Sequence, residues 1–374
     1  MRRYLPPSPA ALPLILLLSL AATACTPAAA VTLPPSASPI AVVATPLPTP
    51  SPSPSPIPTP TPIPTPTPLS AVSHLTGLPV DPKLAHHTPV AVMIDDARAA
   101  RPQSGFNGAS VVFQAPADGY ETRYLMIYGE GDSPQVGPVR SARFFLVQWS
   151  IETASIIGHY GGDRKTRRFL RYESQLMTDV DALGKGAKAF HRIASRRAPH
   201  NGYTTTKALR KKGTKLGAPA LMAADILPRA FIDPSAPATR AAKQSIRVPY
   251  NTNVITWTYD RATNLYRRSV DGRAQIDPAD GKRVTATNVV VLFQKFHIDT
   301  HIEPGHARPV LKTTGTGVAW IYREGHVVKA RWSKDRDVAT TRLLDKDGNE
   351  IPLIRGRTFF QVVPKGTRVT HRAR

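Results

Sequence analysis

The stretch from Pro89 to Tyr128 reads PVAVMIDDARAARPQSGFNGASVVFQAPADGYETRYLMIY and contains three short apolar runs. They are PVAVMI from Pro89, SVVFQ from Ser110 and RYLMIY from Arg123. Each run has the usual strand length of about four to eight residues and is bounded by turn-forming residues. A fourth run of the same kind, SIIGHY, begins at Ser155. We therefore predict four strands in this region.

Helical patterns lie among and after these runs. The segment from Ser141 to Thr153 carries aromatic and aliphatic residues on a broad face, which predicts a helix that begins at Ser141. A second helix is predicted from Thr206 to Lys212, with a threonine as its cap and Gly213 at its end. The mixture indicates an α/β (α+β) N-terminal domain over residues 74–235, with a largely buried sheet.

The character of the sequence changes near Ile246. Short β-rich runs, such as those at 254–259, 289–294, 318–322 and 357–363, are separated by turn dipeptides. These dipeptides begin at Asp271, Asp280, Glu324 and Asp347, and each ends in glycine, which is a strong hairpin signal. We predict a mostly antiparallel β domain over residues 245–366, joined to the first by an Ala- and Pro-rich linker within 226–244.

The first 73 residues carry the signals for export and are not predicted to belong to a folded domain. Two arginines precede an apolar run that is too short to span a bilayer, so residues 1–24 read as a signal peptide. The run ends in Ala-Thr-Ala before Cys25, the only cysteine in the chain, which resembles the bacterial lipobox. Lipidation of Cys25 would tether the protein to the extracytoplasmic face of the cell membrane. An ordinary secretory signal with an incidental cysteine is the alternative.

Residues 25–73 form the predicted spacer. Every even position from Pro46 to Pro68 is proline, and proline fixes φ and removes a hydrogen-bond donor. A disordered, proline-rich linker of polyproline II character follows, and at ~3.1 Å per residue the alternating part would extend on the order of 70 Å.

The chain has 49 basic and 26 acidic residues, a formal net charge of +23. Such a chain is attracted to polyanions, including anionic cell-wall polymers, lipid headgroups and nucleic acid. No recognisable nucleic-acid module interleaves aromatic with basic residues, so nucleic acid is the less favoured partner. With its one cysteine assigned to the lipid, the mature chain has no disulfide.

Several phrases along the chain form a familiar set: LTGLPVDP from Leu75, VGPVRSAR from Val136, APHNGYT from Ala198 and TNLYRRSVDG from Thr263. Together they resemble the YerB-like bacterial lipoproteins, a family with a two-part domain of unknown function. The resemblance extends to Pro364. It implies an α/β first part, a β second part and an extracytoplasmic location, but no established reaction.

One segment departs from the family pattern. Where the family tends to read E-x-x-x-E-G-G-I-T-R, this chain reads QAPADGYETR, with Gln114 and Asp118 at the two acidic positions. A mechanism that needs both carboxylates is therefore in doubt. Glu121 is a possible substitute, although it would face differently on a strand.

The phrase VGPVRSAR supplies the first candidate site. Arg140 and Arg143 flank Ser141 at the predicted helix start, and with Arg123 they could bind a phosphate or carboxylate. Alternatively, Ser141 caps the helix and the arginines pair with Asp95, Asp96 or Asp118.

A second candidate combines His159 and Gly161, at a predicted strand end, with His200 and Asn201 in a loop. Glycines at strand ends allow a ligand to approach the backbone closely. Asp95 or His200 could act as a general base, or His200 could activate Ser141, but no G-x-S-x-G elbow is present.

A third group, His297, His301, Glu303 and His306, has a spacing that could gather a metal, but it lacks the H-E-x-x-H arrangement, and a polar hairpin loop is the alternative. We therefore predict no metal or cofactor.

The sequence thus predicts a lipid-anchored envelope protein that binds an anionic or cell-wall glycan-type ligand, or another envelope protein. It favours binding over catalysis and leaves enzyme activity open. A cell-wall hydrolase is the first alternative, and a polyanion- or nucleic-acid-binding adaptor is the second.

Overall fold

The computed structural model describes residues 71–373, apart from 154, 174–175, 221–228 and 304. The predicted signal peptide, Cys25 and nearly all of the spacer therefore lie outside the described residues. The described residues belong to one compact unit.

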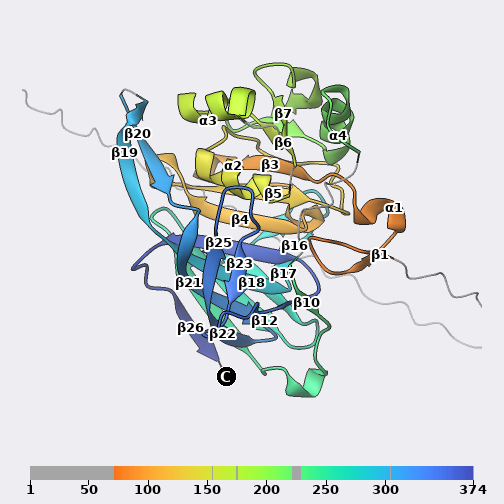
Figure 1. The fold of residues 1–374 in the computed structure, drawn as a ribbon, viewed down its shortest axis with the longest axis vertical. Coiled ribbons are helices and arrows are strands. Elements are labelled where there is room, and N and C mark those ends of the chain that lie inside the picture. Colours follow the sequence, from red (N-terminus) through yellow and green to blue (C-terminus); the bar gives the residue numbers. More distant parts are fainter. Residues whose placement is uncertain (1–70, 154, 174–175, 221–228, 304, 374) are drawn as a thin grey trace, which may run out of the picture. The chain divides into compact units, whose positions relative to one another are not determined.

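Among the described residues, ten strands form a central sheet that includes both halves of the sequence (Figure 1). Across the sheet the strands are β23 (Arg342–Leu344), β22 (His326–Lys334), β21 (Gly315–Arg323), β18 (Asn288–Gln294), β25 (Thr358–Pro364), β4 (Val111–Pro116), β5 (Thr122–Tyr128), β3 (Val90–Asp95), β6 (Ile156–His159) and β7 (Thr178–Asp181). The four strands predicted in the first half are confirmed as β3 to β6. The junction between the halves is the parallel pair of β25 and β4.

Six strands of this sheet run in the same direction, so the loops that follow them lie at one edge. Strands β18, β25 and β4 are parallel, and so are β3, β6 and β7. Strand β5 is antiparallel to both β4 and β3, so all six parallel strands run the same way. Their carboxyl ends therefore share one edge, where α/β sheets commonly place ligands.

A second sheet belongs to the C-terminal region. It contains β14 (Arg273–Ala274), β13 (Leu265–Val270), β12 (Val254–Asp260), β11 (Gln244–Pro249) and β26 (Thr370–Ala373), and β17 (Thr285–Ala286) also pairs with β13. All its pairings are antiparallel, so the C-terminal region is mostly antiparallel β as predicted.

Five two-stranded pairs complete the β structure of the residues that the structure describes. They are β1 (Ala71–Val72) with β2 (Pro79–Val80), β8 (Phe190–Arg192) with β9 (Gly202–Thr204), β10 (Phe231–Ile232) with β24 (Leu353–Ile354), β15 (Ile276–Asp277) with β16 (Lys282–Arg283), and β19 (Phe296–Glu303) with β20 (His306–Leu311).

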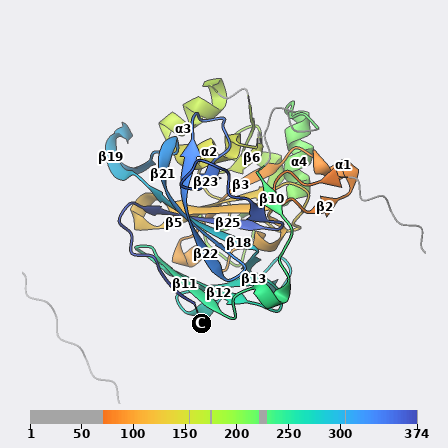
Figure 2. The same cartoon turned by 60° about the horizontal axis from the view of Figure 1, so that its bottom comes forward.

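The N-terminal region is mixed and has few helices. Its α-helices are α1 (Pro82–Ala85), α2 (Phe144–Ile151), α3 (Arg164–Arg168) and α4 (Thr206–Lys215). The core residues show that α2 and the residues that follow α3 cover one face of the central sheet, whereas α4 and the second sheet cover the other. Figure 2 shows α2 and α3 on one side of β6 and α4 on the other. Every residue of β3 and β5 is buried, and burial on both faces explains their long apolar runs.

Both predicted helices have different bounds in the structure. Helix α2 begins at Phe144, not Ser141, because the preceding segment is extended and bridges β3 through Val139. Helix α4 continues past Gly213, where a Cβ would lie 2.7 Å from the Ile156 side chain. That glycine therefore permits close packing on β6, and the chain turns instead at Gly217, whose φ is +95°.

Candidate functional site

The carboxyl edge of the central sheet collects most of the predicted site residues. Asp95 ends β3 and His159 ends β6. The turn between β4 and β5 contains a short 3-10 helix, η3 (Asp118–Tyr120). Charged side chains from these three places form separate clusters at this edge.

The first cluster is centred on Asp95, a buried carboxylate. Nδ1 of His200 donates a hydrogen bond of 2.7 Å to its Oδ2, and Nε of Arg140 lies 3.4 Å from the same oxygen. Its other oxygen, Oδ1, accepts a bond from the backbone N–H of Ala97. Asp95 therefore holds an imidazole and a guanidinium side by side. We call these three side chains the Asp95 cluster.

Arg140 and His200 of the Asp95 cluster retain unused hydrogen-bonding groups. Within the described residues, no N–H group of Arg140 donates a hydrogen bond, and Nε2 of His200 has no partner. The Arg140 side chain is 30% exposed and that of His200 is 23% exposed. Both side chains can therefore reach a ligand from the solvent.

The second cluster is centred on Asp118, and each of its arginines has a partner within the protein, while Nε of Arg123 is buried without a hydrogen bond among the described residues. Arg143 donates to Oδ2 of Asp118 through Nε, at 2.6 Å, and through Nη2. Arg308 donates to Oδ1 at 3.1 Å. Arg123 lies 3.8 Å from Asp118 and donates to the carbonyl oxygen of Ser141 at 2.8 Å. These four charged side chains are the Asp118 cluster.

The pKa values in the Asp118 cluster are set by burial and by the contact of one carboxylate with three guanidinium groups. Burial alone would raise the pKa of Asp118, but the hydrogen bond and charge of Arg143, then the charges of Arg123 and Arg308, lower it below its usual value. Burial lowers the pKa of Arg123 to about 9, and the neighbouring charge of Arg143 acts in the same direction. Arg123 and Arg143 therefore contact Asp118 within the protein, and pairing of Arg143 with Asp118 is one of the alternatives that the sequence left open.

Asp96, next to Asp95, points into a buried polar network instead. Its carboxylate accepts hydrogen bonds from Arg101 at 3.0 Å, Gln103 at 2.8 Å and Asn253 at 3.1 Å. Asn253 belongs to the second half of the sequence, so this network joins the two halves. Period-two alternation explains why neighbouring aspartates separate in this way.

His159, Gly161 and Asn201 also have internal partners. Nε2 of His159 contacts Oδ1 of Asp179 at 2.7 Å, and Nδ1 contacts the carbonyl oxygen of Gly161 at 2.8 Å. Two acceptors require two N–H groups, so the ring is protonated. Burial would lower the pKa of His159, but the bond and charge of Asp179 outweigh burial and raise it. The Asn201 amide accepts from Arg192 and donates to Ile193.

Ser141 is not placed as a nucleophile. Its backbone precedes α2 by three residues, so it does not cap the helix. In the described part of the chain, its hydroxyl makes no hydrogen bond to His200 or to any other group. Ser141 and His200 are therefore not hydrogen-bonded as a nucleophile and its base would be.

Glu121, which the sequence offers as a possible substitute for a missing carboxylate, lies near the Asp95 cluster. It follows η3 and precedes β5, so strand alternation does not set its direction. Burial, followed by the charges of Asp95 and Asp96, raises the pKa of its carboxyl group above the usual value. Glu121 therefore lies within electrostatic range of the Asp95 cluster. The signal in the sequence was its place in QAPADGYETR, where the family pattern has two acidic residues.

The histidines considered as metal ligands lie on the β19–β20 hairpin. His297 and His301 are on β19, His306 is on β20, and the His301 side chain is 95% exposed. Across residues 71–373, outside the gaps, no three His, Cys, Asp or Glu side chains are arranged to hold a metal ion. The structure does not bring these histidines together as a metal site.

Comparison with known proteins assigns the family. Residues 75–219 match the domain described as "Protein of unknown function (DUF3048) N-terminal domain", and residues 246–360 match the corresponding C-terminal domain. The chain belongs to the DUF3048 family. This confirms the YerB-like resemblance found in the sequence, and the family description carries no activity.

A DUF3048 relative and a related solved structure agree with this assignment. "Putative lipoprotein YerB" of Bacillus subtilis (strain 168) is 32% identical over 301 residues, which cover 78% of this chain and 85% of the relative. The crystal structure of YerB protein from Bacillus subtilis has a TM-score of 0.71 at 27% identity, covering 81% of this chain and all of that chain. Within the described residues, no helix is long and apolar enough to span a membrane.

Gln114, the departure from the DUF3048 pattern, has a structural role here. Its amide nitrogen donates to Asp96 at 3.1 Å and to Thr122 at 2.8 Å, and its oxygen accepts from Arg268 at 2.6 Å. An ionised glutamate could not donate to Asp96 and would place two like charges together. Glutamine therefore suits the buried network in this chain.

Proposed function

We propose that this protein is a lipoprotein anchored through Cys25 on the extracytoplasmic face of the cell membrane, where it binds an anionic ligand with Arg140 and His200. The anchor is supported by the signal pattern before Cys25 and by the lipoprotein named among its relatives. Ligand binding is supported by the geometry of the Asp95 cluster.

The observation that carries the binding proposal is the set of unused donors on Arg140. Its Nε lies 3.4 Å from the buried Asp95 carboxylate, yet none of its N–H groups makes a hydrogen bond within the described residues. A planar guanidinium with free donors matches the geometry of a carboxylate or phosphate. Protonated His200, fixed by Asp95, would add a donor from Nε2.

The ligand class follows from the proposed location and the charge of the chain. A carboxylate or phosphate group repeated along a cell-wall polymer would encounter this basic protein outside the membrane. Binding through a localised cluster differs from general polyanion attraction, because it depends on particular donors and on their geometry. Another envelope protein that presents an acidic side chain would satisfy the same cluster.

The binding test measures the affinity of the full chain in detergent for a soluble polyol-phosphate oligomer, at fixed salt. Arg140→Ala should weaken binding more than tenfold, because charge-assisted hydrogen bonds of roughly 1.5–3 kcal/mol are lost. Arg140→Lys should restore only part of the affinity, since lysine keeps the charge but not the planar fork. Arg98, an exposed arginine after β3, provides the matched control Arg98→Ala. Equal affinities in all three variants would contradict the site.

A specific observation also favours hydrolysis as a second candidate. With Nδ1–H of His200 bound to Asp95, Nε2 of the neutral imidazole is an acceptor, as in a general base that activates water. Glu121 lies nearby with a raised pKa, which suits an acid. Product release from purified cell wall, abolished by His200→Asn and retained in Arg98→Ala, would support a hydrolase. Stoichiometric binding without product release would exclude the hydrolase and support the binding proposal.

The anchor has its own test. Cys25→Ser should shift the protein from the membrane fraction to a soluble or unprocessed form, because the lipidated thiol is lost. Membrane retention after signal cleavage would exclude the lipid anchor.

A further inference from the structure

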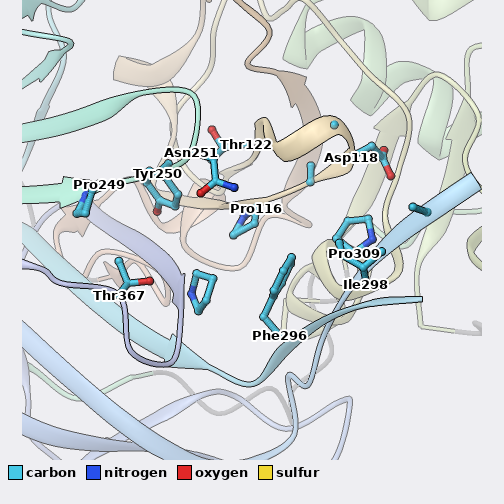
Figure 3. A pocket seen from close by; sticks show the side chains of 14 residues that line it. Pro116, Asp118, Thr122, Pro249, Tyr250, Asn251, Phe296, Ile298, Pro309 and Thr367 are labelled. Atoms are coloured by element: carbon cyan, nitrogen blue, oxygen red, sulfur yellow. The ribbon is translucent and has the colours of Figure 1, made fainter. Parts of the chain in front are cut away.

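A cavity of about 350 Å³ opens at the carboxyl edge of the central sheet, beside the Asp118 cluster (Figure 3). Its walls come from both halves of the sequence: the β4–β5 turn, the end of β11, the β19–β20 hairpin and the segment after β25. The volume lies within the range of small-molecule sites. Neither half of the chain could form this cavity alone.

The apolar walls of the cavity are mostly flat rings. Tyr250 and Phe296 face the space together with the rings of Pro116, Pro249 and Pro309 (Figure 3). Aromatic and proline rings present broad, rigid apolar surfaces and lose little side-chain entropy when a ligand covers them. They therefore suit a ligand with a flat apolar face.

The charges around the cavity favour a neutral ligand. Among the residues that the structure describes, no Lys, Arg or His side chain lines it. Its one acidic residue, Asp118, already accepts hydrogen bonds from Arg143 and Arg308. A cation would find this carboxylate neutralised, and an anion would find no counter-charge in contact.

Two neutral polar side chains remain available to a ligand. Asn251 is exposed, and neither its amide group nor the hydroxyl of Thr367 has a hydrogen-bond partner within the described residues. By contrast, the hydroxyl of Thr122 binds Asp96, and that of Tyr250 binds the carbonyl oxygen of Gln114. An amide and a hydroxyl thus stand beside the apolar rings.

We propose that this cavity binds a neutral sugar unit of a glycan strand, of the N-acetylhexosamine type. A pyranose ring presents an apolar C–H face that packs on flat rings, with hydroxyl and acetamido groups around its rim that Asn251 and Thr367 can bind. The site is separate from the Asp95 cluster. The sugar proposal depends on the proposed extracytoplasmic location only in one respect, which is the choice of a glycan as the ligand.

The test measures binding of the neutral β-1,4-linked N-acetylglucosamine tetramer to the full chain in detergent by calorimetry. Asn251→Ala should weaken binding about three- to tenfold, the effect of losing one or two neutral hydrogen bonds. Ala307→Trp places a large side chain in the cavity from an exposed position on β20, so it should abolish binding without disturbing the core. Thr252→Ala is the matched control, because Thr252 shares the turn with Asn251 but does not line the cavity.

Three results would overturn the sugar site. They are no detectable tetramer binding by the wild type, binding that survives Ala307→Trp, or displacement of the tetramer by a neutral proline-containing peptide that binds more tightly. Arg140→Ala should leave tetramer binding unchanged, so failure of the anion site and failure of the sugar site are separate outcomes.

Discussion

Asp118 and Asp95 lie at the same edge of the sheet and each contacts basic side chains. The two sites differ in how many hydrogen-bonding groups of those side chains remain free. Asp118 engages Arg143 through two donors, and a third donor of Arg143 binds the carbonyl oxygen of Ala142. Asp95 holds Arg140 and His200 but leaves most of their hydrogen-bonding groups free. We call the Asp118 cluster closed, because its charged side chains bind one another. We call the Asp95 cluster open, because donors of Arg140 and one ring nitrogen of His200 remain available to a ligand.

The difference lies in backbone context rather than in residue type. Arg143 occupies the cap position of α2 and is nearly buried, with an 8% exposed side chain. Arg140 lies three residues earlier in an extended segment between β3 and β6, and its side chain is 30% exposed. Satisfied buried charges stabilise a fold, whereas unsatisfied, partly exposed donors can bind a ligand. Neighbouring arginines in one motif thus have different roles.

The largest expected effect comes from opening the closed cluster. Asp118→Ala would leave Arg123 and Arg143 buried without a counter-charge, so we expect a loss of about 3–5 kcal/mol in the free energy of unfolding. Urea denaturation measures this loss. Asp347→Ala, which removes an exposed carboxylate paired with Lys346, should change stability by less than about 1 kcal/mol. Similar results for the two variants would mean that the Asp118 cluster is not structural.

The two arginines provide the sharpest comparison. Arg143→Ala should lower stability by about 2–3 kcal/mol, because hydrogen bonds to an ionised group are lost. Arg140→Ala breaks no hydrogen bond in the protein and should lower stability by less than about 1 kcal/mol. Thermal melts of the two variants, made without any ligand, test this order. Equal destabilisation would show that Arg140 is also a structural residue.

His159 is a second closed group, and its effect depends on pH. Its raised pKa means that the folded state binds the proton more tightly, so this stabilisation is complete below the usual value of 6.5 and is lost as the pH rises through the folded value. His159→Gln should therefore lower stability by roughly 1–3 kcal/mol at pH 5.5 and by less at pH 9. His301→Gln is the exposed control and should show neither effect. A loss independent of pH would contradict the protonated ring.

The smallest expected effect is a gain in stability at the open cluster. The raised pKa of Glu121 means that the unfolded state ionises first, so folding loses stability as the pH rises above the usual value of 4.5. Glu121→Gln should therefore raise the melting temperature at pH 7, and the gain should disappear near pH 4. A lower melting temperature at pH 7 would indicate that the Glu121 carboxylate is stabilised by the fold.

Much of the fold was accessible from local patterns. The apolar runs became β3 to β6, because strands buried on both faces have no polar alternation to obscure them. The predicted helix start at Ser141 was wrong, because apolar periodicity does not show at which residue an extended segment ends and a helix begins. A glycine that ends a helix and one that packs against a strand also look alike in sequence, as Gly213 shows.

The sequence by itself determined the family, the alternation of elements and the presence of arginines, histidines and aspartates near strand ends, because these features depend on residue type and spacing. It also named Asp95, Arg140 and His200, and it gave pairing of the arginines with Asp95 as one of several alternatives. Only the tertiary structure decided which arginine is free and which is committed. Pairing depends on side chains from distant segments, such as Asp118 with Arg308 and Asp96 with Asn253. The cavity is likewise tertiary, since its walls come from segments that meet only when both halves fold into one sheet.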